Sequence, residues 1–243
     1  FIPGKTIIPY SGPVWGQEEV CAAIEAFLGG KWLTSGEAVR EFECGFSDCI
    51  GQRQSVMTNS GSAANLLMLA ALRSTQRYGF TDIEILTPVA GFPTTVAPII
   101  QNGFRPRFVD IELDTLNLDL DQVEAAITPK TKALLFAAVL GNPPDMDRVL
   151  ELCQRRGLVL LEDTCDALGS KWNGQPIGSF GAMSTCSFYP AHHITTGEGG
   201  MISTSDPILA RVLRSLCWWG RDCYCVGKAN LLERGTCGHR FDT

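Results

Sequence analysis

The stretch Leu158-Val-Leu-Leu-Glu162-Asp163-Thr-Cys165-Asp166 decides the fold. Its uninterrupted apolar residues predict a β-strand that is buried on both faces, as the strands of a parallel sheet are. The acidic residues stand at the carboxyl end of this strand, where open α/β sheets bind their ligands. Asp163 is therefore a candidate ligand-binding carboxylate, suited to a cationic ring nitrogen. The alternative is that Asp163 only caps the turn that follows.

Short apolar runs alternate with helical patterns along the chain on both sides of this strand. The predicted strands are 55–58, 84–87, 107–110, 133–139, 158–162, 183–188 and 200–204. The predicted helices are 17–28, 38–49, 63–77, 94–102, 120–127, 146–156 and 207–217. The alternation predicts an α/β fold with a mostly parallel sheet flanked by helices. We expect an N-terminal arm and helix over 1–35 and one α/β domain over 36–243, with a cysteine-rich segment at 217–237.

Composition excludes several classes of protein. The chain has 243 residues and a net charge of −6, and no basic stripe favours a nucleic-acid partner. The longest apolar run, 133–140, is far shorter than the roughly 18 residues of a membrane helix, so no membrane partner is expected. The ten cysteines are unevenly spaced and no signal-peptide pattern opens the chain, which favours reduced thiols and a cytoplasmic location.

Two further segments carry candidate chemistry. Asn59-Ser60-Gly61-Ser62-Ala63 lies between a predicted strand and a predicted helix, where free backbone amides and hydroxyls form an anion site suited to phosphate. A tight turn with a helix N-cap is the alternative. The segment 187–200 holds the pair His192-His193 before a glycine-rich turn. An imidazole there suits a general base, a metal ligand or a structural residue.

Together these segments resemble the DegT/DnrJ/EryC1/StrS family, the nucleotide-sugar aminotransferases of fold type I that use pyridoxal phosphate. The matching pieces occur in the family's order and span most of the chain: 59–63, 66–67, 88–97, 106–111, 162–163, 169–181 and 187–200. The resemblance implies the large, cofactor-binding domain of that fold. The family's C-terminal small domain has no counterpart in the sequence, so we expect a fragment.

The resemblance also implies roles for individual residues. Asp163 would pair with the protonated pyridine nitrogen of the cofactor, which keeps the ring an electron sink. Phe92 would stack on the ring, and Gly61, Ser62 and Ser187 would hold the cofactor phosphate.

His192 stands where the aminotransferases have the lysine that attaches the cofactor covalently. An imidazole forms no imine, so ordinary transamination is not expected, whereas a base acting near neutral pH is. This substitution resembles the 4-keto-6-deoxyhexose 3-dehydratases of the family. It implies untethered pyridoxamine 5'-phosphate as the cofactor, a nucleotide-diphosphate 4-keto-6-deoxy sugar as the substrate, and loss of the sugar's C3 hydroxyl.

Four cysteines suggest a second cofactor. Cys165, Cys223, Cys225 and Cys237 supply the four thiolates that a [2Fe-2S] cluster requires. Their arrangement resembles that of the CDP-4-keto-6-deoxyglucose 3-dehydrases, although the interval before Cys237 is longer. This resemblance implies a separate NAD(P)H-dependent flavin and iron-sulfur reductase as electron source, and a homodimer.

Four alternatives stay open. Cys223, Cys225, Cys237 and His239 also suit a zinc site, with Cys165 a buried thiol. The second alternative is that these cysteines are core thiols without a metal. The third is a 3-dehydratase without a cluster, which renews its cofactor with glutamate, or another sugar aminotransferase-family member. The fourth is a catalytically silent regulatory relative. The remaining cysteines are predicted to be small core residues: Cys21, Cys44, Cys49, Cys153, Cys186 and Cys217.

Overall fold

The computed structural model describes residues 1–7, 11–29, 35–75 and 78–220. Seven strands form one sheet in the order β1-β9-β8-β5-β4-β2-β3, and β9 alone among them runs against the others. Their bounds are β1 Gln54–Thr58, β2 Glu84–Pro88, β3 Arg105–Val109, β4 Thr131–Ala137, β5 Val159–Asp163, β8 Met183–Ser187 and β9 Gly200–Thr204. This arrangement confirms the predicted α/β fold with a mostly parallel sheet.

Each predicted helix is present, with ends within a few residues of those expected. The bounds are α1 Gln17–Gly29, α2 Glu37–Ile50, α3 Gly61–Ser74, α4 Pro93–Gln101, α5 Leu120–Ala126, α6 Met146–Arg156 and α7 Pro207–Cys217. Local sequence sets these ends. Asp206 caps α7 by accepting from the backbone N–H groups of Ile208 and Leu209, and Gly157 ends α6 at a φ of +64°.

The sequence did not predict the hairpin of β6 Lys171–Trp172 and β7 Gln175–Pro176. Strands of two residues are too short to show the alternation by which strands are recognised in a sequence.

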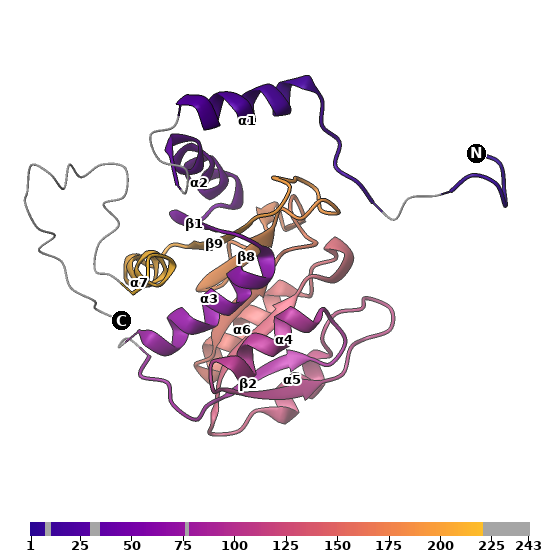
Figure 1. The fold of residues 1–243 in the computed structure, drawn as a ribbon. Helices are drawn as coiled ribbons and strands as arrows, with labels where there is room; N and C mark the ends of the chain where they lie inside the picture. The colour runs from indigo at the N-terminus through magenta and orange to yellow at the C-terminus, as the bar shows by residue number, and fades with distance from the viewer. Residues whose placement is uncertain (8–10, 30–34, 76–77, 221–243) are drawn as a thin grey trace, which may run out of the picture.

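Helices cover both faces of the sheet (Figure 1). α3, α4 and α7 pack on one face, against β4 residues such as Leu135, while α5 and α6 pack on the other, against Leu134 and Phe136. α2 covers the second face at the β1 end, where Phe46 packs against Phe188 and Met201. The strands therefore lie in the middle layer of three, as the apolar run at 158–161 predicted.

Three of the cysteines predicted to lie in the core do not. Cys153 and Cys186 are buried and Cys217 is half-buried, but Cys21, Cys44 and Cys49 are exposed. The buried stripe of α2 is Glu43, Phe46, Ser47 and Ile50, which includes two polar residues. The prediction that Cys44 and Cys49 lie on the buried face of α2 was therefore wrong, because it relied on hydrophobicity alone.

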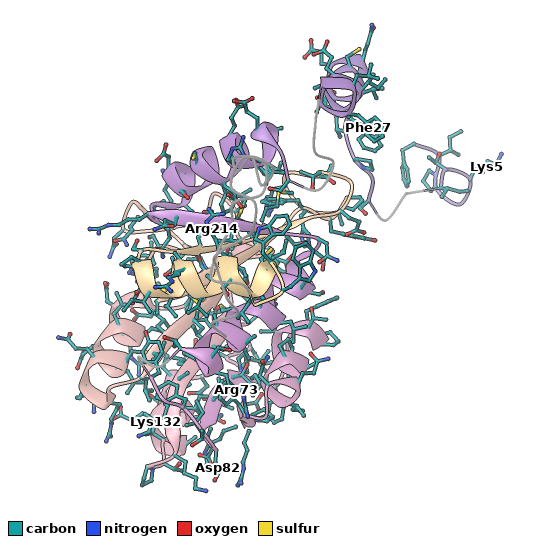
Figure 2. The ribbon with its side chains drawn as sticks, turned by 60° about the vertical axis from the view of Figure 1, so that its left-hand side comes forward. Lys5, Phe27, Arg73, Asp82, Lys132 and Arg214 are labelled. Atoms are coloured by element: carbon teal, nitrogen blue, oxygen red, sulfur yellow. The ribbon has the colours of Figure 1, made fainter. Side chains whose placement is uncertain are left out.

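α1 stands apart from the sheet and its helices (Figure 1). None of its residues is buried, and the side chain of Phe27 is largely exposed, as Figure 2 shows. The division of the chain at residue 35 stays a prediction. Among the described residues, no helix is both long and apolar enough to cross a membrane.

The two ends of the sheet carry different sets of residues. At the carboxyl end of the parallel strands, Thr58 pairs with Gly200, Gly200 pairs with Ser187, and Asp163 pairs with Thr185, two residues before Ser187. Three predicted segments, far apart in sequence, thus meet at one end of the sheet. We call this the carboxyl end of the sheet.

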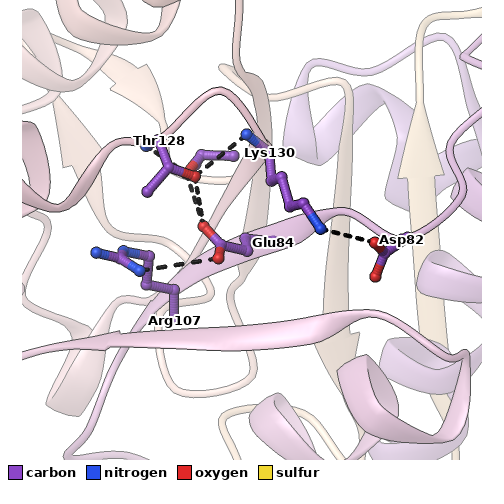
Figure 3. Close-up of polar contacts among 6 residues, drawn as sticks. Asp82, Glu84, Arg107, Thr128 and Lys130 are labelled. Atoms are coloured by element: carbon purple, nitrogen blue, oxygen red, sulfur yellow. Dashed lines mark hydrogen bonds and ion pairs between the residues drawn. The ribbon is translucent and has the colours of Figure 1, made fainter.

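Several polar side chains contact one another at the opposite end of the sheet (Figure 3). Glu84, the first residue of β2, accepts a hydrogen bond of 2.6 Å from the hydroxyl of Thr128 and lies 3.8 Å from the guanidinium of Arg107. Lys130 pairs with Asp82 at 2.8 Å. These contacts tie β2, β3 and the start of β4 together far from the predicted site.

Candidate functional site

Asp163 is a buried carboxylate with fixed hydrogen-bond donors. It is the last residue of β5 and is 5% exposed. Its Oδ2 accepts a hydrogen bond of 2.8 Å from Asn65 Nδ2 on α3 and one of 2.7 Å from Thr95 Oγ1 on α4. The hydroxyl of Thr185 in β8 donates to Asn65 Oδ1 at 2.6 Å, which fixes the orientation of the amide. The carboxylate is therefore held rigidly at the carboxyl end of the sheet.

Sequence reasoning missed Asn65 and Thr95. Asn65 interrupts the apolar run of its helix, and both side chains are 2% exposed. A buried polar side chain needs a partner, so an amide inside an apolar helix was the signal that pointed to a polar site nearby.

Asp163 also caps the turn after β5. Its Oδ1 accepts from the backbone N–H of Cys165 at 3.2 Å, which confirms the capping alternative. Capping does not exclude ligand binding, because a carboxylate oxygen accepts more than one hydrogen bond. The role of Asp163 toward a ring nitrogen stays a prediction.

The segment after β1 packs closely against β8 and the loop after β5 at Gly61. We call Gly61 and its neighbours Ser187 and Cys165 the Gly61 cradle. Ser60 caps α3 by accepting from the backbone N–H of Ala63 at 3.1 Å, so the N-cap alternative is confirmed as well. A Cβ placed on Gly61 would lie 2.5 Å from Cβ of Ser187 and 3.0 Å from Sγ of Cys165. Gly61, Ser187 and Cys165 are thus brought together, in a space that only a glycine leaves open.

Ser62 lies at the start of α3 and Phe92 at the start of α4. Ser62 is exposed in the first turn of α3 and donates its hydroxyl to Thr94 Oγ1 at 2.9 Å, which links α3 to α4. Phe92 directly precedes α4, and its side chain is 67% exposed. Its exposure leaves an aromatic face available to a ligand.

His192 is paired with Asp166. Its Nδ1 lies 3.3 Å from Oδ1 of Asp166, and its ring makes an edge contact with Tyr189 at 6.1 Å between centroids. A carboxylate beside Nδ1 favours the tautomer that carries the proton there and leaves Nε2 free. Asp166 follows Cys165 directly, so the structure brings His192 to the loop that begins at Asp163. The neighbouring His193 is exposed.

The thiol of Cys165 adjoins Gly61 and is protonated. Burial, together with the negative charge of Asp163, raises the pKa of Cys165 well above its usual value. A bound metal would reverse this, because thiols bind metals as thiolates. Cys223, Cys225, Cys237 and His239 lie outside the described residues, and within the described ranges no three His, Cys, Asp or Glu residues form a group suited to a metal.

Known proteins resemble this chain along most of its length. It is 45% identical to the lipopolysaccharide biosynthesis protein RfbH of Salmonella typhimurium, over 99% of this chain and 55% of that protein. It is 44% identical to the dTDP-4-dehydro-2,6-dideoxy-D-glucose 3-dehydratase of Saccharopolyspora spinosa, over 100% of this chain and 52% of that enzyme. The chain thus spans about half the length of these relatives.

A solved structure agrees with the sequence relatives. The E. coli GDP-4-keto-6-deoxy-D-mannose-3-dehydratase with bound hydrated PLP matches with a TM-score of 0.80 and 38% identity, over 86% of this chain and 53% of that one. The match confirms the predicted fold type I domain. Residues 15–239 match the family model of these proteins. The chain belongs to the DegT/DnrJ/EryC1/StrS aminotransferase family.

Proposed function

We propose that this chain is the cofactor-binding part of a nucleotide-sugar 3-dehydrase that uses pyridoxamine 5'-phosphate to remove the C3 hydroxyl of a 4-keto-6-deoxy sugar. The observation that carries the proposal is the pairing of His192 with Asp166, 3.3 Å apart, in the loop that begins at Asp163, whose carboxylate is held by two donors. The names of the relatives, two of them 3-dehydratases, support the same chemistry.

The described residues fit this cofactor. Asp163 would face the protonated pyridine nitrogen, since its buried carboxylate is held by two donors and stays an acceptor. The cradle at Gly61, where a Cβ would meet Ser187, suits the phosphate together with the hydroxyl of Ser62. Phe92 would cover the ring. When bound, the cofactor supplies an electron sink for bond cleavage in the sugar.

His192 would act as the base. With Nδ1 directed to Asp166, Nε2 would be the atom that takes up a proton when the cofactor and substrate are bound. A histidine holds the cofactor by no covalent bond, so binding depends on Asp163, Phe92 and the phosphate cradle.

We further propose that Cys165, Cys223, Cys225 and Cys237 hold a [2Fe-2S] cluster. The position of Cys165 supports this, because its Sγ adjoins the Gly61 cradle and its backbone N–H bonds to Asp163. A cluster there would supply single electrons next to the cofactor ring. An NAD(P)H-dependent flavin and iron-sulfur reductase would deliver them in a reducing cytoplasm, and two subunits would share their active sites.

The test uses protein purified without oxygen. Titration with pyridoxamine 5'-phosphate is expected to raise the melting temperature, and the visible spectrum is expected to show iron-sulfur absorption. Cys165→Ser should lose the iron and keep cofactor binding. Absence of a melting shift would favour a silent relative and overturn the proposal.

Two further outcomes separate the remaining alternatives. Dehydration of the sugar by protein without iron absorption would favour the 3-dehydratase that needs no cluster. Zinc in place of iron in a metal analysis would favour the zinc site at Cys223, Cys225, Cys237 and His239.

A further inference from the structure

The turn 139–142, which follows β4, has an unusual backbone. The N–H of Asn142 donates to the carbonyl of Val139 at 3.0 Å, and the two residues between them, Leu140 and Gly141, have φ angles of +54° and +78°. Positive φ at both central positions is the geometry of a type I′ turn, in which asparagine and glycine are the usual residues. Leucine rarely adopts it, because a left-handed backbone brings Cβ too close to a carbonyl oxygen.

Burial of Leu140 does not offset this strain. The residue is 79% exposed, so it adds little hydrophobic stabilisation. Strained backbone persists only where its surroundings hold it, and it gathers at functional sites. The turn lies at the carboxyl end of the sheet, because Ala137 at the end of β4 pairs with Asp163, and the N–H of Ala138 donates to the Asp163 carbonyl at 3.2 Å. The turn therefore lies against the loop that follows Asp163.

Gly141 and Ser170 join the turn to that loop. The hydroxyl of Ser170 donates to the carbonyl of Gly141 at 2.6 Å. A Cβ placed on Gly141 would lie 3.1 Å from the carbonyl oxygen of Asp166 and 3.3 Å from Oγ of Ser170. Glycine at this position thus allows both the positive φ and the close approach to Asp166. The turn therefore fixes the backbone that carries the Asp166 carboxylate.

Asp166 and His192 come from different segments, so their contact depends on where each backbone is held. The backbone N–H of His192 donates to the carbonyl of Tyr189 at 3.0 Å, within its own segment. Asp166 Oδ1 lies 3.3 Å from His192 Nδ1, which is at the long end of hydrogen-bond distances. A small displacement of Asp166 would therefore break the contact.

We propose that the turn 139–142 positions the base His192 through Asp166. Gly141 and the hydroxyl of Ser170 hold the backbone of Asp166, and the Asp166 carboxylate then keeps the imidazole proton on Nδ1. The proposal rests on the proposed function, in which Nε2 of His192 takes up the proton. Gly141 and Ser170 act through Asp166, so they are positioning residues.

The test measures the tautomer of His192 by NMR. The imidazole nitrogen resonances of the isotope-labelled protein are recorded above the titration range of imidazole, where the two tautomers give different pairs of shifts. His192→Asn identifies the signals by their loss, and Asp166→Asn gives the shifts of His192 without its carboxylate. In the unaltered protein, we expect the proton on Nδ1.

Two variants disturb the positioning contact. Ser170→Ala loses the hydrogen bond to Gly141, and Gly141→Ala pushes against the carbonyl of Asp166. In both variants the His192 resonances should shift toward those of Asp166→Asn, because the displaced carboxylate no longer selects the tautomer. If Gly141→Ala fails to fold, Ser170→Ala alone decides the outcome.

Matched controls separate positioning from loss of stability. Ser179→Ala removes a hydroxyl that donates to the carbonyl of Pro176 in another loop. Gly174→Ala adds a Cβ at a φ of +83° where no atom lies within 4 Å, so it has the backbone strain of an alanine at 141 without the contact. Both controls should lower the melting temperature and leave the His192 resonances unchanged. A merely structural role of the turn would lower the melting temperature in every variant and shift the resonances in none.

Three results would overturn the proposal. Unshifted His192 resonances in Ser170→Ala would show that the turn does not position the carboxylate. Identical resonances in the unaltered protein and Asp166→Asn would show that the carboxylate does not select the tautomer. An equal shift in Ser179→Ala would show that the tautomer responds to any loss of stability.

Failure of the proposed function gives a different result. A protein that keeps the proton on Nδ1 of His192, but whose melting temperature does not rise with pyridoxamine 5'-phosphate, would refute cofactor binding and leave the positioning of Asp166 intact.

Discussion

Asn65 Nδ2 donates to Asp163 Oδ2 at 2.8 Å, and this amide is oriented in turn by the hydroxyl of Thr185. The contact runs from the interior of α3 to the end of β5, two elements 98 residues apart in sequence. It fixes the side chain of the carboxylate on which the proposed cofactor site depends.

Asn65→Asp tests this contact. A second carboxylate so close to Asp163 removes a donor and adds repulsion, so one of the two is forced to bind a proton. Hydrogen bonds to charged groups contribute about 1.5–3 kcal/mol, so affinity for pyridoxamine 5'-phosphate should fall about 10–100-fold. Thr95→Ser keeps its hydroxyl and is the control. Fluorescence titration measures both, and equal affinities would refute the role of Asn65.

Asp166→Asn tests the orientation of His192. An amide no longer selects the tautomer that leaves Nε2 free, so kcat for dehydration should fall by about 10²-fold or more. The affinity for pyridoxamine 5'-phosphate should not change, because Asp166 lies outside the phosphate cradle. A variant with unchanged kcat would show that Asp166 does not position the base.

His192→Lys tests the absence of a tether. A lysine amine at this position should attach pyridoxal phosphate covalently, so borohydride reduction should add the mass of the cofactor to the chain. Dehydration should be lost. His192→Asn, the control, should lose dehydration without covalent attachment, as mass spectrometry would show. Full dehydration activity in either variant would rule out His192 as the base.

Gly200→Ala tests the close packing of β9 against the start of α3. Its Cβ would collide with the Ser60 carbonyl and lie 2.6 Å from the Gly61 nitrogen. Overpacking of this kind costs about 1–3 kcal/mol of unfolding free energy. Gly45→Ala in α2 meets nothing within 4 Å and should instead stabilise by about 0.4–1 kcal/mol. Urea denaturation measures each variant against the unaltered protein, and an unchanged free energy of unfolding in Gly200→Ala would show that β9 has room to shift.

Glu162 predicts a pH dependence of stability. Burial raises the pKa of Glu162 to about 7 from its usual 4.5, although the backbone N–H groups of Gly178, Phe180 and Gly181 oppose the shift. The folded state therefore holds a proton that the unfolded state releases. The stabilisation is complete below pH 4.5 and is lost as pH rises through about 7, by at most about 1.4 kcal/mol per pH unit.

Thermal unfolding between pH 4.5 and pH 8 checks whether stability falls with rising pH, as the raised pKa of Glu162 predicts. Glu162→Gln cannot titrate, so the fall in stability across this window should be smaller in the variant. The variant should be less stable overall at low pH, because its amide nitrogen faces backbone N–H groups. Identical slopes in the two proteins would show that Glu162 does not titrate there.

The local part of the fold was predictable because its signals lie within a few residues of each other. The apolar run at 158–161 predicts a buried strand, and Asp206 with Pro207 predicts the start of α7, since capping depends only on adjacent residues. The position of Asp163 at the carboxyl end of β5 follows from the same local pattern.

The sequence by itself determined the alternation of strands and helices and the end of the sheet at which Asp163 stands, because hydrophobic period and caps are local properties. Only the tertiary structure decided that Asn65 and Thr95 hold that carboxylate, that Asp166 pairs with His192, and that Arg214 crosses the edge of β1 to Glu43. Those partners come from different elements. Their pairing depends on strand order and helix placement, which the packing of the whole core sets and no short stretch of sequence encodes.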